Sequence, residues 1–209
     1  MRALVVYSHP KEGSFNAAIR DLVVSKLRRS GAEVEVIDLY AEGFDPTLTA
    51  HELDIYEATD ANVRPVQRHV DALRRCDTLI FVYPTWWYGL PAMLKGWLDR
   101  VMVPGVAFTM PEGGDIGPGL THITRLGVFT TCGASWWLTR LIGAPGRKTL
   151  LRGVRLICAK RVKTAFAAHY LMDSSTPETR AAHLARLDRK LDRFIGARKV
   201  ESVPERAAA

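Results

Sequence analysis

The sequence predicts a three-layer α/β sandwich, in which helices cover both faces of a five-stranded parallel sheet. Short apolar runs alternate along the chain with segments whose apolar residues recur at helical spacing. Parallel strands need long, right-handed crossovers, and the helical segments supply them. Five strands favour the order 2-1-3-4-5, in which a ligand binds at the carboxyl ends of the strands, near the point where the order reverses.

Each element has its own local signal. The expected strands are 3–7, 33–39, 77–83, 125–131 and 154–160, and the expected helices are 15–27, 63–75, 91–101, 145–151 and 176–194. The first strand is an apolar run typical of a strand buried on both faces, whereas the second alternates polar and apolar residues. Pro91 suits the first turn of its helix, and Thr176 followed by Pro177 begins the last helix.

Length and composition predict one compact domain. The chain has 209 residues, of which 47% are hydrophobic, so residues 1–195 can form one core and 196–209 are expected to be a flexible C-terminal tail. No apolar run approaches the roughly 20 residues of a membrane span, and a strand-like segment follows Met1 directly, so we expect a cytoplasmic protein. Cys76, Cys132 and Cys158 are odd in number and far apart, which indicates reduced thiols rather than disulfides or a metal site.

The net charge of +7 raises the question of an anionic partner. Most of the surplus lies in residues 147–163 and 180–206, and neither range contains a helix-turn-helix, zinc-finger or RNA-binding aromatic motif. We therefore expect no nucleic-acid partner. A cofactor that carries phosphates would use the same sign of charge.

The loop 8–16, between the first strand and the first helix, is a candidate phosphate site. It contains a single glycine and so matches neither the dinucleotide fingerprint nor the Walker motif. Ser14 is nevertheless a good N-cap, and the free amides of the first helical turn, with the helix dipole, favour an anion. His9 can add a donor and Lys11 a charge. The alternative is an ordinary capped helix after a surface turn.

The segment 83–91, Tyr-Pro-Thr-Trp-Trp-Tyr-Gly-Leu-Pro, follows the third strand directly. A packing strand would space its aromatic residues by two on one face, whereas here three adjacent aromatics stand beside proline and glycine. This arrangement indicates a wall for a flat ligand. An ordinary hydrophobic loop that packs on a neighbouring helix is the alternative.

Together these motifs resemble the flavodoxin-like NAD(P)H:quinone oxidoreductases. The group includes bacterial modulator-of-drug-activity reductases and the quinone-reductase subunits of potassium efflux systems. The resemblance covers residues 2–135 and rests on 7–10 (Tyr-Ser-His-Pro), 14–16 (Ser-Phe-Asn), 38–40 (Asp-Leu-Tyr), 44–46 (Phe-Asp-Pro) and 83–101. Beyond residue 135 it is weak.

The resemblance implies a flavin site. The implied cofactor contacts are His9, Ser14, Phe15, Asn16, Pro84, Thr85, Trp86, Trp87, Thr130, Thr131, Cys132 and Gly133. The loop 8–16 would hold the phosphates, 84–88 would flank the ring, and 130–133 would lie beneath its pyrimidine end. Cys132 stands where the family usually has glycine, which would cost about 1 kcal/mol or more if the position needs a positive φ. Tyr88, Trp136 and Trp137 are candidates for the acceptor pocket, and the two tryptophans could equally pack at a dimer seam.

The implied activity is the reduction of quinones or similar flat electrophiles by a ping-pong transfer of hydride from NAD(P)H through flavin N5. FAD is expected ahead of FMN, with NAD(P)H as co-substrate, a homodimer as the assembly, and no metal. Because this chemistry belongs to the cofactor, no catalytic side chain is assigned. Alternatives are an azo- or nitro-reductase, a regulatory subunit of a membrane potassium transporter, and an electron carrier, which the basic charge disfavours.

Overall fold

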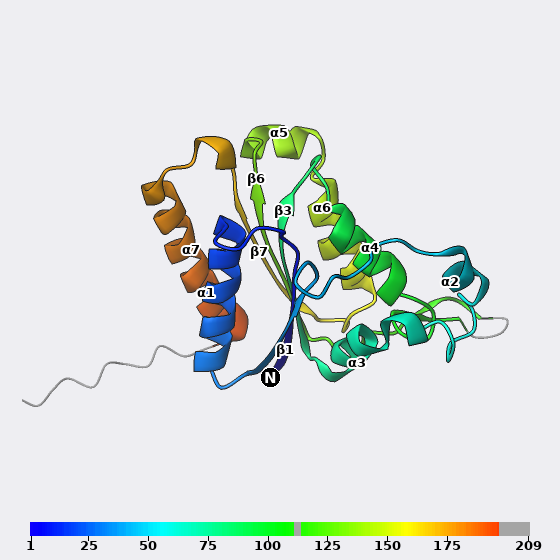
Figure 1. Ribbon diagram of the computed structural model, residues 1–209. Helices are drawn as coiled ribbons and strands as arrows, with labels where there is room; N and C mark the ends of the chain where they lie inside the picture. Colours follow the sequence, from blue (N-terminus) through cyan, green and yellow to red (C-terminus); the bar gives the residue numbers. More distant parts are fainter. Residues whose placement is uncertain (111–113, 197–209) are drawn as a thin grey trace, which may run out of the picture.

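The computed structural model describes residues 1–110 and 114–196 and confirms the three-layer α/β sandwich (Figure 1). Its parallel strands are β1 (Arg2–Tyr7), β2 (Glu33–Asp38), β3 (Thr78–Thr85), β6 (Arg125–Cys132) and β7 (Lys163–His169). They are arranged β2-β1-β3-β6-β7, which is the predicted order 2-1-3-4-5 when these five are counted along the chain. Thr85 pairs with Cys132, so β3 and β6 end together at one edge.

Helices cover both faces of the sheet. In Figure 1, α1 (Phe15–Arg29) and α7 (Pro177–Ile195) lie on one face, and α3 (Gln67–Arg75), α4 (Ala92–Val101) and α6 (Pro145–Lys148) lie on the other. The shorter elements are α2 (Ala50–Asp54), η1 (Arg64–Val66), β4 (Phe108–Thr109), β5 (Gly117–Pro118), α5 (Trp136–Leu141), η2 (Thr149–Val154) and η3 (Met172–Ser174). Among the described helices, none is both long and apolar enough to cross a bilayer.

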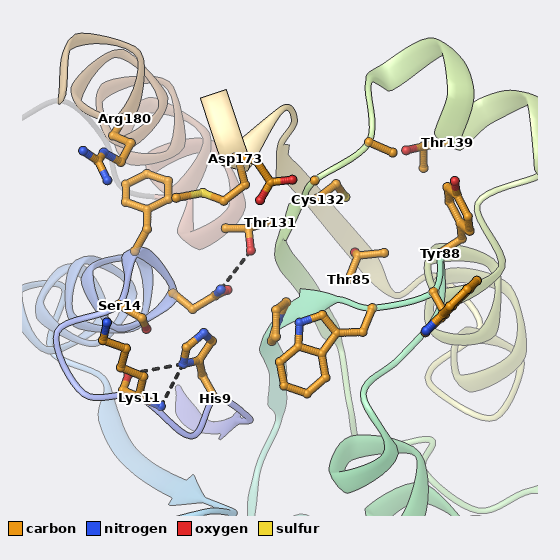
Figure 2. Close-up of a pocket in the computed structure, with 18 of the residues that line it drawn as sticks. His9, Lys11, Ser14, Thr85, Tyr88, Thr131, Cys132, Thr139, Asp173 and Arg180 are labelled. Atoms are coloured by element: carbon orange, nitrogen blue, oxygen red, sulfur yellow. Dashed lines mark hydrogen bonds between the residues drawn. The ribbon is translucent and has the colours of Figure 1, made fainter. Parts of the chain in front are cut away.

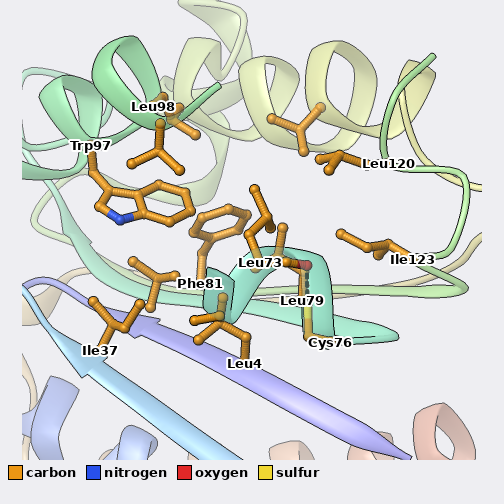
Figure 3. Close-up of a cluster of buried hydrophobic side chains, with 14 of the residues drawn as sticks. Leu4, Ile37, Leu73, Cys76, Leu79, Phe81, Trp97, Leu98, Leu120 and Ile123 are labelled. Atoms are coloured by element: carbon orange, nitrogen blue, oxygen red, sulfur yellow. Dashed lines mark hydrogen bonds between the residues drawn. The ribbon is translucent and has the colours of Figure 1, made fainter. Parts of the chain in front are cut away.

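The core beneath α3 and α4 fixes the position of α4 (Figure 3). Trp97 meets the ring of Phe81 edge-on at 6.0 Å, and its indole Nε1 donates a hydrogen bond of 3.2 Å to His69 Nδ1. A Cβ on Gly96 would lie 2.1 Å from the carbonyl oxygen of Pro46, so only glycine allows this approach. This packing holds the helix that follows the aromatic segment.

The predicted helix starts at both N-caps are confirmed. Ser14 Oγ accepts a hydrogen bond from the amide of Ala17, and Thr176 caps α7, with Pro177 as its first residue. Gly196 ends α7 with a φ of 83°, and the rest of the predicted tail, 197–209, lies outside the described residues.

The strand predicted over 154–160 is wrong. The π-helical turn η2 occupies Thr149–Val154, and the fifth strand is β7, which begins at Lys163. Val154 ends this turn, and Ile157 and Cys158 follow it as a turn and an isolated bridge to Leu120, so these apolar residues pack on the core without forming a strand. β7 is an edge strand rich in alanine and polar residues, and it lacks the apolar run that marks a central strand.

Candidate functional site

A cavity of about 1130 Å³ opens at the carboxyl edge of the sheet, where open α/β sheets bind ligands. It gathers the three predicted loops into one site. The predicted residues that line it are His9, Ser14, Phe15, Asn16, Pro84, Thr85, Trp86, Trp87, Tyr88, Thr131, Cys132 and Gly133. Figure 2 shows Lys11, Ser14 and His9 on one side of this cavity and Tyr88 and Thr139 on the opposite side.

The N-terminus of α1 forms one end of the cavity. Because Ser14 satisfies only the amide of Ala17, the other first-turn amides remain for a ligand, and this turn contains no acidic residue. Lys11 and Arg180 line the same cavity and add positive charge. Amides, helix dipole and cations together make this end suited to phosphate.

His9 adds a neutral polar ring to this end. Its Nδ1 lies 3.0 Å from the amide nitrogen and 3.2 Å from the carbonyl oxygen of Lys11, which fixes the ring against the loop. Burial lowers the pKa of the His9 imidazole, so the neutral form dominates at pH 7. His9 therefore adds polarity to this end of the cavity rather than a permanent charge.

Asn16 carries an unsatisfied acceptor in the middle of the cavity wall. Its Nδ2 donates a hydrogen bond of 2.9 Å to Thr131 Oγ1, which ties α1 to β6. Its Oδ1 is buried and has no hydrogen-bond partner among the described residues. An orphaned buried acceptor costs about 1–3 kcal/mol, and a hydrogen bond from a ligand hydroxyl would remove this cost.

The aromatic segment forms a strained tight turn. Trp87 and Tyr88 have φ values of 47° and 61°, and the amide of Gly89 donates a hydrogen bond of 2.9 Å to the carbonyl of Trp86. These features define a type I′ turn, which normally uses asparagine and glycine because both central residues need a positive φ. Backbone strain of this kind is typical of functional sites. The turn sets Trp86 into the cavity and leaves Trp87 94% exposed.

The end of β6 forms the floor of the site. Thr130 is buried within hydrogen-bond distance of Thr85, at 2.9 Å between the hydroxyl oxygens, and it does not line the main cavity. Cys132 lies in the strand, and it is absent from the described non-glycine residues with positive φ, so the strain considered for it does not arise. Burial raises the pKa of its thiol, which disfavours a reactive thiolate.

Trp136 and Trp137 lie on α5 above the edge of the sheet (Figure 1). Trp136 lines a second cavity of about 540 Å³, which shares Thr85, Tyr88, Cys132 and Thr139 with the first. Trp137 lines neither cavity and is 64% exposed.

Several lining residues were missed because they come from the end of the chain. Met172 and Asp173 belong to η3, and Arg180 to the first turns of α7. A signal for Arg180 was present, because a helix that follows the last parallel strand begins at the ligand-binding edge. The two η3 residues carry no such signal, since the strand before them was itself placed wrongly.

Comparison with known proteins assigns the fold family. A family described as having a flavodoxin-like fold matches residues 1–195. The chain belongs to this family. This match confirms the family that the motifs of the sequence predicted.

Individual relatives of this flavodoxin-like protein carry quinone reductase names. Rat NAD(P)H dehydrogenase (quinone) 1 is 33% identical over 161 residues, which are 69% of this chain and 58% of the relative. Human ribosyldihydronicotinamide dehydrogenase (quinone) is 33% identical over 148 residues, 62% of this chain and 63% of the relative. The chain thus spans less than two thirds of the length of these curated relatives. The solved NAD(P)H:quinone oxidoreductase of Methanothermobacter marburgensis is 25% identical, with a TM-score of 0.75 over 91% of this chain and 97% of that one.

Proposed function

We propose that this protein is a flavin-dependent NAD(P)H oxidoreductase that reduces quinones or similar flat electrophiles. One observation carries the proposal: the first cavity brings together three kinds of group that suit the three parts of a flavin nucleotide. The N-terminus of α1 suits the phosphates, the free Oδ1 of Asn16 suits a ribityl hydroxyl, and the indole of Trp86 suits the ring. The names of the relatives support the same class of reaction.

Bound flavin would accept a hydride from NAD(P)H and pass two electrons to the acceptor. The protein itself has three tasks. The type I′ turn fixes Trp86 so that a ring stacks at one position, the loop 8–16 holds the phosphates, and Leu138 adds an apolar contact in the same cavity. Cys132 stays neutral because burial raises its pKa, so it takes no part as a nucleophile.

The cofactor is FAD rather than FMN in this proposal. A dinucleotide needs charge for a second phosphate, and Lys11 and Arg180 both line the phosphate end. The cavity volume of about 1130 Å³ also exceeds the range of roughly 300–1,000 Å³ usual for ligand sites. The mass of the released chromophore distinguishes the two flavins.

The functional unit in this proposal is a homodimer in the cytoplasm. An exposed apolar face at the carboxyl edge supports the dimer; it consists of Trp87, Trp136, Trp137, Leu141 and Ile142. Exposed patches of this kind usually mark interfaces. Light scattering tests the homodimer. We expect the wild type to be a dimer and Trp137→Glu to dissociate more readily, and a monomeric wild type would contradict the proposal.

Purification with a visible spectrum tests the flavin assignment. A yellow protein that turns over NADPH with menadione is expected, and a colourless protein that refuses added FAD and FMN would exclude the proposal. Nitro- and azo-compounds should be assayed beside menadione, because an open flavin site accepts many flat acceptors. Co-purification with a potassium transporter would instead indicate the regulatory role.

A further inference from the structure

A cluster of cations lines the second cavity. Its lining includes Arg140, Arg147, Lys148, Arg152 and Arg155, and neither aspartate nor glutamate is among its lining residues. The lining also contains aromatic and hydroxyl side chains from the sheet and from the segment after it, namely Tyr83, Thr130, Thr164, Phe166 and Tyr170. A concave site with this composition is suited to an anion attached to a flat group.

These cations are not neutralised by the fold. In the described part of the chain, none of the five forms an ion pair with a carboxylate. Arg147 instead lies over the ring of Phe166, 4.7 Å from its centroid, and Arg140 lies over Trp136 at 5.6 Å. By contrast, Lys26 on α1 pairs with both Asp188 and Asp192. The cavity thus gathers in one place five cations that form no ion pair within the described residues.

The backbone around the cations has two unusual conformations. Ala144, which precedes α6, has a φ of 49°, in the left-handed region that alanine rarely adopts. Thr149–Val154 then forms a π-helical turn, a rare element that occurs most often at functional sites. Arg152 lies within this turn and Arg155 caps its end. Two costly conformations in succession, both beside the same cavity, support a binding role rather than an ordinary solvated helix.

The second cavity adjoins the first. The two share Thr85, Tyr88, Cys132 and Thr139, and these residues lie on the side of the first cavity opposite Lys11 and Ser14 (Figure 2). A molecule whose flat end enters the first cavity can therefore extend its anionic end over this shared wall into the second. The cations of the second cavity would bind that anionic end, and they are separate from Lys11 and Arg180 of the first cavity.

We propose that the second cavity binds the 2′-phosphate of NADPH and makes NADPH the preferred hydride donor over NADH. This inference rests on the proposed function, since it specifies which co-substrate the flavin site meets. The names of the relatives indicate that the hydride donor differs among similar proteins. One is named for NAD(P)H and another for ribosyldihydronicotinamide, which lacks the adenosine phosphates. The five unpaired cations of the second cavity would bind the 2′-phosphate that NADPH carries and NADH lacks, and so would distinguish the two hydride donors.

The first test is a binding titration that needs neither flavin nor turnover. Adenosine 2′,5′-bisphosphate and 5′-AMP are titrated into the purified protein by calorimetry. We expect the bisphosphate to bind at least tenfold more tightly, with a dissociation constant that rises with salt. Equal affinity for the two nucleotides would overturn the proposal.

The second test compares a double variant, Arg152→Gln/Arg155→Gln, with a matched control, Lys160→Gln/Arg161→Gln. The control removes two exposed cations that lie close in the chain and line neither cavity. In the double variant we expect the affinity for the bisphosphate, and the ratio of kcat/KM for NADPH to that for NADH, each to fall roughly tenfold. The control should keep both.

Unchanged affinity of the double variant for the bisphosphate would overturn the inference. So would a double variant whose only change is a raised KM for a sulfonated azo dye, because the cations would then bind the acceptor. Failure of the flavin assignment is separate, because it abolishes oxidation of both nucleotides and leaves the bisphosphate titration unaffected.

Discussion

Two buried histidines beside the site make the fold sensitive to acid. His169 at the end of β7 and His183 on α7 are 5% and 3% exposed, and their ring centroids lie 5.1 Å apart. Phe15, the first residue of α1, packs edge-on against both rings, at 5.0 Å and 5.8 Å. The Nε2 atoms of both histidines are buried without a hydrogen-bond partner among the described residues. Neither ring therefore has a counter-ion that would stabilise its charged form.

The size of the effect follows from the pKa of His183. Burial lowers the pKa of His183 to about 4, and the neighbouring His169 and Arg186 contribute to this shift. Burial, with Arg186 and Arg180, also lowers the pKa of His169. An unfolded histidine titrates near ~6.5, so between pH 6.5 and 4 the unfolded chain binds more protons than the folded one. The free energy of unfolding therefore falls as the pH falls through this window. A shift of ~2.5 units at ~1.4 kcal/mol each gives a loss on the order of 3 kcal/mol from His183 alone.

Urea denaturation followed by circular dichroism at pH 7 and pH 4 measures this loss. The variant His183→Leu removes the titrating ring and should lose about 3 kcal/mol less than the wild type over the same interval. His51→Gln, which removes an exposed imidazole on α2, is the control and should follow the wild type. Equal losses in wild type and His183→Leu would refute the reasoning, as would an NMR titration that puts the His183 pKa above 6.

Three further predictions concern the site and its support. Trp87→Asn should raise the free energy of unfolding by about 1 kcal/mol, because asparagine tolerates the positive φ of the type I′ turn; an unchanged or lower urea midpoint would show that the turn is not strained. Gly96→Ala should cost about 3 kcal/mol in thermal or urea unfolding, since its Cβ would meet backbone at 2.1 Å, whereas Gly153→Ala, with nothing within 4 Å, is the matched control and should be near neutral. If both substitutions have the same effect, the close contact at Gly96 does not exist in solution. Asn16→Leu should weaken flavin binding roughly tenfold in a fluorescence titration, because it removes the free acceptor; unchanged affinity would exclude that contact.

The sequence predicts those parts of the fold that have strong local signals. Four of the five strands are found where expected because each is an apolar or alternating run that the sheet buries. The fifth fails because β7 has neither an apolar run nor the regular alternation that marks β2 at the opposite edge, whereas apolar residues before it pack around η2. Local pattern thus identifies buried elements and misses those that only tertiary packing defines.

The candidate site likewise has parts that local sequence patterns predict and parts that only tertiary packing defines. The loops 8–16 and 84–88 are predictable because each joins a recognisable strand to a capped or proline-led helix. Arg180 has no motif of its own, and only the position of its helix after the last strand indicates that it lies at the ligand-binding edge, where α7 packs beside α1. The backbone strain is also found elsewhere than expected: it falls on Trp87 and Tyr88, while Cys132 continues the ladder with Thr85. A positive φ at two adjacent aromatic residues has no sequence signature, because such residues ordinarily avoid it.

The two cavities explain where much of the surplus positive charge lies. Lys11 and Arg180 line the first cavity at the end opposite the shared wall, and the five cations of the second cavity lie beyond that wall. Between them are Trp86 and the neutral groups Thr85 and Cys132, where no permanent charge opposes a flat ring. Two phosphorylated molecules can therefore approach one another with their flat ends together and their phosphates apart, since each anionic end has its own cations. An electron carrier needs a single such end, so the second cationic cavity favours an enzyme that brings two nucleotides together.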